Sequence, residues 1–195
     1  MKTFICVSGV LIMLMLSLVG CSDKSQSPVD PTDKDQVSLE KCPAVIHYTE
    51  SHYPLEILDP GTVTVVGNKM IIKKVVVKER LDASNNLVTG YMTHKLSAIL
   101  NLNTGEGPMW GTYTLKPDAF ASGPEKWEGT YTGWRSKTPG SDTLFTIPLK
   151  VLGQGKGKAL KGMKLFLNDV ITGWGTPPTG WYGGGKGYIT SNGHH

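Results

Sequence analysis

The chain has 195 residues, of which 39% are hydrophobic, a content that suits one buried core rather than two. Its 24 glycines and 8% aromatic residues fit an all-β domain with many turns better than a helical bundle. The formal net charge of +4 comes from lysines and arginines that are scattered along the chain. No basic run argues for nucleic acid, so we expect no nucleic-acid partner.

The first 20 residues have the pattern of an export signal. Lys2 supplies a minimal basic start, and residues 4–19 form an apolar run that is too short for a comfortable transmembrane helix. The run ends in Leu18-Val19-Gly20-Cys21, which resembles a bacterial lipobox, in which the cysteine is acylated before cleavage. The alternative is an ordinary secretory signal with a chance cysteine. By resemblance to Gram-negative lipoproteins, Ser22 after Cys21 implies transfer to the outer membrane.

Residues 21–42 are predicted to be a lipidated, flexible tether. Ser22 to Lys41 is polar, contains prolines and has almost no apolar residues to bury. As a flexible coil it spans about 25 Å. With Cys6 in the signal and Cys21 acylated, Cys42 is the one cysteine left, so no intrachain disulfide is expected. Cys42 is then either a buried or inert thiol, or one that reacts or pairs with another molecule.

The folded domain is expected to span residues 43–193, excluding the terminal His194-His195, which resembles a tag remnant. Alternation and turn residues predict strands over 44–49, 62–66, 69–80, 88–102, two within 108–135, then 143–152, 158–170 and 186–190. The intervening turns and loops are 52–60, 67–68, 82–86, 104–107, 136–142 and 174–187. Residues 158–170 also fit a helical stripe, but Gly162 favours a strand.

The clearest alternation runs from Val88 to Leu102. One face carries Val88, Gly90, Met92, His94, Leu96, Ala98, Leu100 and Leu102. A period of two over this length is hard to obtain from a helix. A strand of this length suits a coiled sheet that closes into a barrel.

The stretch Pro108–Arg135 contains the sequence Gly-Thr-Tyr-Thr twice, and each copy follows a tryptophan. In the first copy Tyr113 points away from Trp110. In the second, Trp127, Tyr131 and Arg135 share a face that Trp134 opposes. Because Glu128 is inserted between the second tryptophan and its glycine, we expect a β-bulge there. The stretch therefore predicts two antiparallel strands whose aromatic residues divide between the two faces.

These eight or nine strands are joined by turns too short for crossover connections, so neighbouring strands are antiparallel. Closure of the sheet removes exposed edges. The predicted fold is all-β, a single antiparallel β-barrel of about eight strands.

The glycine-punctuated strands, the Trp-Gly-Thr-Tyr stretch and the segment Gly155–Gly162 resemble the allene oxide cyclase and dirigent group of β-barrels. That group has a Gly-x-Gly-x-aromatic-x-x-Gly bend, and here Ala159 or Leu160 occupies the aromatic position. The resemblance covers residues 61–189 and implies a barrel. Members of the group include a cyclase and proteins that guide radical coupling, but their catalytic residues have no counterpart that can be placed on this sequence.

His94 is the sharpest candidate for chemistry, because it lies on the predicted inner face. Buried there, it is either a general base or ligand contact, or a core histidine hydrogen-bonded to a neighbouring strand. The aromatic residues Tyr113, Trp127 and Tyr131 either line a ligand cavity or simply fill the core. Arg135 on the same face can pair with an anionic ligand or stack on an aromatic ring.

Other motifs are weaker. His47 and His52 lie on opposite faces of a strand, and Glu50 between them is not expected to help, so no metal site is predicted. Residues 180–186 match a phosphate loop superficially, but Gly187 replaces the required Ser or Thr, and a mobile loop at the barrel mouth is expected instead. No catalytic triad, paired-carboxylate motif or cofactor is indicated.

Three functional hypotheses remain. The first is a non-enzymatic, membrane-anchored envelope lipoprotein whose barrel binds a small apolar or aromatic ligand. The second is a cyclase or isomerase of the same barrel group, with His94 and a tyrosine as an acid–base pair. The third is a structural or interaction protein whose outer face meets a protein partner.

Overall fold

The computed structural model describes residues 44–141, 143–175 and 180–191. The predicted signal (1–20) and tether (21–42), with Cys21 and Cys42, lie outside these residues. In chain order the elements are β1 (Val45–Asp59), β2 (Thr62–Val66), β3 (Lys69–Ala83), β4 (Gly90–Asn101), β5 (Gly107–Pro117), the short 3-10 helix η1 (Asp118–Phe120), β6 (Lys126–Lys137), β7 (Leu144–Lys156), β8 (Lys164–Trp174) and β9 (Gly180–Thr190).

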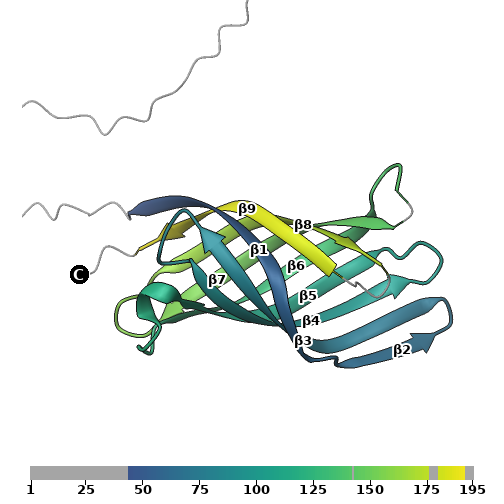
Figure 1. Ribbon diagram of the computed structural model, residues 1–195, viewed down its shortest axis with the longest axis horizontal. Helices are drawn as coiled ribbons and strands as arrows, with labels where there is room; N and C mark the ends of the chain where they lie inside the picture. Colours follow the sequence, from purple (N-terminus) through teal and green to yellow (C-terminus); the bar gives the residue numbers. More distant parts are fainter. Residues whose placement is uncertain (1–43, 142, 176–179, 192–195) are drawn as a thin grey trace, which may run out of the picture. The chain divides into compact units, whose positions relative to one another are not determined.

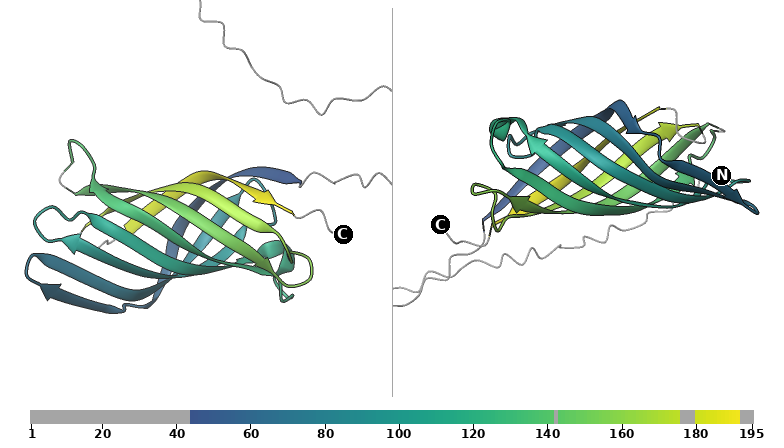
Figure 2. Two further views of the ribbon diagram at one scale, coloured as in Figure 1. Left: turned by 180° about the vertical axis from the view of Figure 1, so that it is seen from behind. Right: turned by 90° about the horizontal axis from the view of Figure 1, so that it is seen from below.

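Eight of the nine strands in the described part of the chain close into one antiparallel barrel (Figures 1 and 2). Strands β3 to β9 pair with their neighbours in chain order, and β1 pairs with β9 on one edge and β3 on the other. The remaining strand, β2, pairs with β3 alone and lies at the outer margin of the sheet (Figure 1). The predicted all-β barrel of about eight strands is confirmed.

Strand β1 joins the two edges of the sheet through its two halves. Residues 45–52 pair with β9, and residues 50–59 pair with β3. The prediction of a loop over residues 52–60 is therefore wrong. Pro54 is the residue that suggests a loop in the sequence. It lies at a register shift in the β1–β3 ladder, where an irregular backbone tolerates the missing N–H of a proline.

A bulge in β3 changes which of its residues face the barrel interior. The β3–β4 register shifts between Ile72 and Val75, and Lys74 has a positive φ of 60°. The inward positions therefore change from even numbers (Ile72) to odd numbers, so that Val77, Glu79 and Leu81 are all buried. This shift brings Glu79 into the barrel.

The glycine-rich segment near the C-terminus is strand β9 from Gly180 onward, and not the mobile loop that the sequence predicts. Gly183, Gly185 and Gly187 pair with His52, Glu50 and Tyr48 of β1. A Cβ on Gly183 would lie 2.0 Å from His52 Nε2, and one on Gly187 would lie 2.5 Å from Tyr48 Cζ. These glycines make room for large inward side chains of β1, which is why a strand can be so rich in glycine.

Strands β5 and β6 carry the repeated Gly-Thr-Tyr-Thr. Their register runs without a shift from Gly107–Arg135 to Leu115–Trp127, so the predicted bulge at Glu128 is wrong. The parity prediction is confirmed: Trp110 and Trp134 are 40% and 53% exposed, while the inward aromatic residues of both strands are buried. Between β7 and β8, residues 158–162 form a turn, and the strand predicted over residues 158–170 begins only at Lys164.

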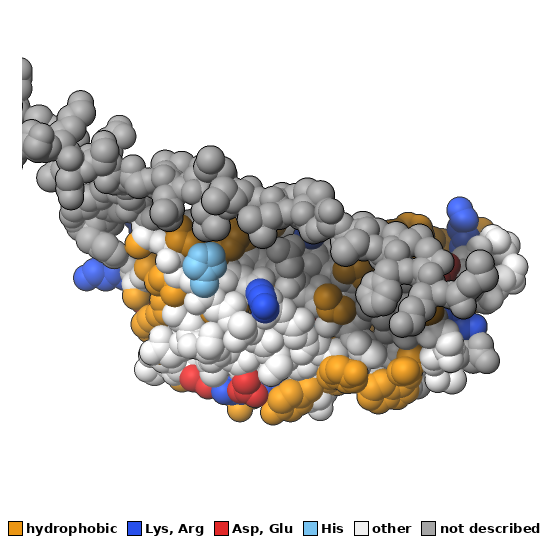
Figure 3. All heavy atoms as spheres, turned by 90° about the horizontal axis from the view of Figure 1, so that it is seen from above, with side chains coloured by type: hydrophobic (Ala, Val, Ile, Leu, Met, Phe, Trp, Pro, Cys, Tyr) orange, Lys and Arg blue, Asp and Glu red, His pale blue; other side chains and the backbone are white. Residues whose placement is uncertain are grey.

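Inward-facing hydrophobic side chains from β1 and from β3 to β9 pack together inside the barrel. Trp127 and Leu160 are fully buried, and Trp127 Nε1 donates to the Leu87 carbonyl oxygen at 2.7 Å. On the outer surface hydrophobic side chains lie among polar ones (orange in Figure 3). All five residues of β2 are exposed. In the described part of the chain, no helix has the length and apolar character needed to cross a membrane.

Candidate ligand site in the barrel interior

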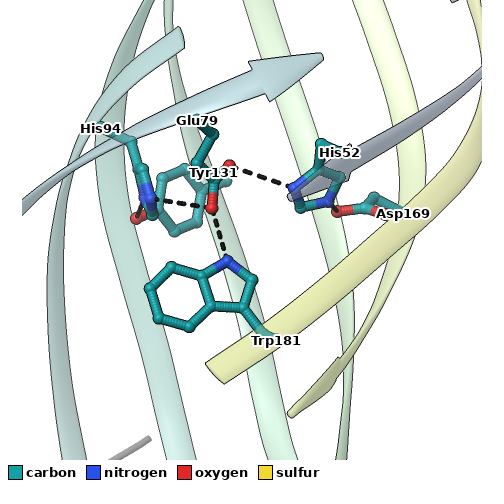
Figure 4. Close-up of polar contacts among 6 residues, drawn as sticks. All are labelled: His52, Glu79, His94, Tyr131, Asp169 and Trp181. Atoms are coloured by element: carbon teal, nitrogen blue, oxygen red, sulfur yellow. Dashed lines mark hydrogen bonds and ion pairs between the residues drawn. The ribbon is translucent and has the colours of Figure 1, made fainter. Parts of the chain in front are cut away.

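Glu79 is the centre of a buried polar network inside the barrel (Figure 4). Its side chain is 1% exposed. His52 Nδ1 lies 3.1 Å from Glu79 Oε2, and Trp181 Nε1 donates to Oε1 at 2.5 Å. His94 Nε2 is 3.3 Å from the same Oε1, within ion-pair distance, but forms no hydrogen bond among the described residues. Three strands far apart in sequence, β1, β4 and β9, thus converge on one carboxylate of β3.

His52 bridges two carboxylates. Its Nδ1 faces Glu79, and its Nε2 lies 3.0 Å from Asp169 Oδ2 on β8. Burial lowers the pKa of His52, but the hydrogen bonds and charges of Asp169 and Glu79 outweigh burial and raise the pKa to about 10. The imidazole is therefore doubly protonated at neutral pH, and each ring nitrogen donates to a carboxylate.

The charge on Glu79 is stabilised by the same contacts. Burial raises the pKa of Glu79, but the hydrogen bond to His52 and the proximity of His94 hold it well below its usual range. Glu50, which is also buried, lacks such contacts. Burial is the main reason that its pKa rises to about 7, and the neighbouring Asp169 and Glu79 carboxylates add to it, while His52 opposes the rise.

His94 and Tyr131 form a second polar pair on the inner wall. His94 Nδ1 lies 2.8 Å from the Tyr131 hydroxyl oxygen, and both residues are buried. Burial, with a smaller contribution from the Glu79 charge, raises the pKa of Tyr131, so its hydroxyl remains protonated. This pair can hold and transfer a proton within the interior.

Arg135 lies inside the barrel near the ends of β5 and β8, with 1% exposure. Its guanidinium carbon is 3.5 Å from the centre of the Phe145 ring, and the group donates to the carbonyl oxygens of Gly105 (3.1 Å) and Gly175. Burial lowers its pKa to about 10. Of the two roles expected from the sequence, the structure contains the aromatic stack.

A cavity of about 80 Å³ lies between these groups, lined mainly by aliphatic and aromatic side chains. The polar or charged residues His52, Glu79, His94, Tyr131 and Asp169 are also among those that line it. Several buried polar atoms have no hydrogen-bond partner among the described residues; these are Tyr48 Oη, Tyr113 Oη, His94 Nε2, Asp169 Oδ1 and both carboxylate oxygens of Glu50. Such atoms are costly unless water or a ligand satisfies them.

Four of the five ligand-site residues predicted from the sequence line this cavity: His94, Tyr113, Tyr131 and Arg135. Trp127 does not line it, because it packs at one end of the core, where the Leu87 carbonyl satisfies its indole N–H. The predicted lipidation site, Cys21, lies outside the described residues.

The sequence prediction does not include the carboxylates and His52 of this network. Glu50 and His52 share the inward face of β1, so the expectation that Glu50 would contribute nothing beside His52 does not hold. Continuing the alternation of β1 beyond Thr49 identifies both residues. The same parity along β8 identifies Asp169, between the inward Leu167 and Ile171. His47 is exposed on the opposite face, as predicted.

Comparisons with protein-family models, with characterised proteins and with solved structures give no match for this chain.

Proposed function

We propose that the chain is a membrane-anchored envelope lipoprotein whose barrel binds a small ligand with an apolar or aromatic body, without catalysis. The lipobox-like segment ending at Cys21 supports the anchor, and the pattern after it supports the outer membrane. The observation that carries the binding proposal is a largely apolar cavity, two of whose lining residues, Tyr48 and Tyr113, have buried hydroxyls without a hydrogen-bond partner among the described residues. The hydroxyls of Tyr48 and Tyr113 are the groups that would orient such a ligand.

The size of the cavity limits the ligand. An engineered protein cavity of about 150 Å³ admits benzene, and this one has about 80 Å³. A ring-sized ligand therefore requires a side chain to move. Trp181 is the best candidate, because it lines the cavity and is only partly buried. Ligand entry is then expected to change tryptophan fluorescence.

Phenol and toluene are suitable probes, and a chelator is present throughout so that metal ions do not contribute to binding. Binding raises the melting temperature of the protein and changes its tryptophan fluorescence. Tyr113→Phe, which removes a hydroxyl and keeps the ring, is expected to weaken phenol binding about tenfold and to leave toluene binding unchanged. The exposed Tyr91→Phe is the matched control. If no probe changes either signal, the binding proposal is wrong.

The anchor has its own test. Growth with a labelled fatty acid is expected to label the wild-type chain and to leave Cys21→Ser unlabelled. Label that persists in Cys21→Ser would contradict the assignment.

The His94–Tyr131 contact of 2.8 Å favours a second candidate, an isomerase or cyclase. In this alternative His94 removes a proton from the substrate and the Tyr131 hydroxyl donates to the oxygen of a carbonyl or epoxide. Conversion of a small β,γ-unsaturated ketone to its conjugated isomer tests the idea, because the reaction moves one proton between two carbons. Turnover that falls by about 10²–10⁴-fold in both His94→Gln and Tyr131→Phe would favour it. Turnover that is absent or unchanged would exclude it.

A further inference from the structure

Glu50, His52 and Asp169 converge inside the barrel. One ligand atom from each lies within 4.8 Å of the others. The three residues are 7%, 4% and 4% exposed. Both carboxylate oxygens of Glu50 and Oδ1 of Asp169 have no hydrogen-bond partner among the described residues. A buried carboxylate with no partner is strongly unfavourable, so these oxygens are suited to contact an electropositive group.

We propose that Glu50, His52 and Asp169 bind a divalent transition-metal ion of the zinc class. The inference does not depend on the proposed ligand. The local charge supports it, because three carboxylates, those of Glu50, Glu79 and Asp169, surround one imidazole. A divalent cation in place of the proton on His52 Nε2 compensates this charge more fully.

The His52 ring is oriented in the same way as the histidine ligands of metal sites. Its Nδ1 faces Glu79 at 3.1 Å, and its Nε2 faces Asp169 Oδ2 at 3.0 Å. Histidine ligands of metals commonly donate the other ring N–H to a carboxylate, which fixes the ring. Glu79 has this position, and the Trp181 indole N–H holds Glu79 in turn.

The spacing is close to that of a coordinated ion. Metal–ligand bonds of about 2.0–2.2 Å place the ligand atoms of a tetrahedral site about 3.3 Å apart. His52 Nε2 and Asp169 Oδ2 are already near this separation, and Glu50 needs only a side-chain adjustment to complete it. His52 and Asp169 also line the cavity, where a water would be the fourth ligand.

The donor set selects the class of metal. One imidazole nitrogen with carboxylate oxygens suits zinc and its neighbours, whereas calcium and magnesium prefer oxygen ligands and more of them. The sequence segment from His47 to His52 contains two of the ligands, Glu50 and His52, on its inward face, and the third, Asp169, comes from β8.

The test is zinc binding by the full chain, stripped with a chelator and re-equilibrated with Zn²⁺. To exclude terminal and thiol binding, every protein carries His194→Ala, His195→Ala, Cys6→Ser, Cys21→Ser and Cys42→Ser. Elemental analysis and calorimetry are expected to give one zinc per chain. Glu50→Gln and Asp169→Asn are each expected to weaken binding at least a hundredfold, and Glu79→Gln by about 10–100-fold through the orientation of His52. His47→Gln, on the outer face of the same strand, is the matched control and should bind normally.

Circular dichroism shows whether each variant folds. A readout that needs no variant is the visible spectrum of the Co²⁺-substituted protein, which reports four-coordinate geometry, together with a zinc-dependent rise in melting temperature. Failure of the background protein to bind zinc stoichiometrically would overturn the proposal and leave the His52 proton as the group that compensates the carboxylates. Unchanged affinity in folded Glu50→Gln and Asp169→Asn would also overturn it.

Discussion

Tyr113 and Gly129 face each other across the β5–β6 pair, and the tyrosine ring occupies the space where a side chain at 129 would be. The same relationship occurs in reverse between Tyr131 and Gly111. Each copy of the repeated Gly-Thr-Tyr therefore supplies the glycine over which the tyrosine of the other copy lies. The repeat is a self-complementary packing unit, and it places both tyrosine side chains on the cavity wall.

Gly129→Ala is expected to destabilise the barrel by about 1–3 kcal/mol or more, as overpacked cores do. The added Cβ would lie 1.9 Å from the Leu152 carbonyl oxygen and 2.7 Å from Tyr113 Cε1, and the backbone oxygen cannot move aside easily. Chemical unfolding measures the loss. Thr130→Ala, at the exposed neighbouring position of the same motif, should change stability little. Equal effects of the two substitutions would contradict this packing account.

Glu79→Gln is expected to cost about 3–5 kcal/mol of folding free energy, because removal of one partner leaves the buried His52 without that counter-charge. The glutamine side chain also has only one acceptor oxygen for the three groups that contact the Glu79 carboxylate, which are His52, His94 and Trp181. Glu128→Gln provides the matched comparison, since Glu128 pairs with Lys126 at 2.7 Å on the exposed surface. Urea unfolding should separate the two variants clearly. A midpoint for Glu79→Gln close to that of Glu128→Gln would show that the network contributes little to stability.

The stability of the metal-free protein is expected to fall as pH rises from about 5 to 9. The pKa of Glu50 is raised from 4.5 to about 7, so the folded state holds a proton that the unfolded chain releases. The resulting stability is complete below 4.5 and is lost as pH rises through 7. The pKa of His52 is raised from 6.5 to about 10, so its contribution is complete below 6.5 and is lost toward pH 10.

Urea unfolding in the presence of a chelator, at about pH 5, 7 and 9, measures this profile. Glu50→Gln should flatten the part between about pH 5 and 7, where Glu50 contributes up to about 3 kcal/mol. Below that range the opposite sign applies to Glu79, whose pKa is lowered, so stability should fall again in acid. A wild-type protein that is most stable near pH 9 would contradict the protonation states assigned here.

Strand alternation predicts the class of fold and most of the inner wall. It identifies His94 on β4 and Tyr131 and Arg135 on β6, because these strands are regular and their parity does not change. The prediction fails where proline or glycine residues suggest a turn or loop but the segment is a strand that pairs with neighbouring strands of the sheet. Pro54 and the glycines of β9 are cases of this kind, since the ladders to β3 and β8 keep both segments extended.

The central network is hidden for a different reason. Glu79 faces inward only because the bulge at Lys74 changes the parity of β3, and a bulge depends on the pairing with β4 rather than on local sequence. Likewise, the proximity of His52 to Asp169 follows from barrel closure, which brings β1 and β8 to opposite edges of β9. Alternation can identify each of these residues as inward-facing, but it does not show which of them are in contact.

Val65→Lys is expected to reduce self-association of the protein at high concentration. Strand β2 pairs with β3 on one edge, and among the described residues nothing pairs with its other edge. Val63, Val65 and Val66 are 53–59% exposed, so the strand is an apolar edge that can pair with another chain. A lysine there opposes edge-to-edge pairing, and because Val65 packs against little, thermal stability should be nearly unchanged.

Light scattering over a concentration series measures the effect. Thr64→Lys, at the neighbouring exposed position, adds the same charge without removing an apolar side chain. If Thr64→Lys reduces self-association less than Val65→Lys does, apolar contact contributes to the association as well as the open edge. A wild-type protein that stays monomeric at every concentration would show that this edge is protected in solution.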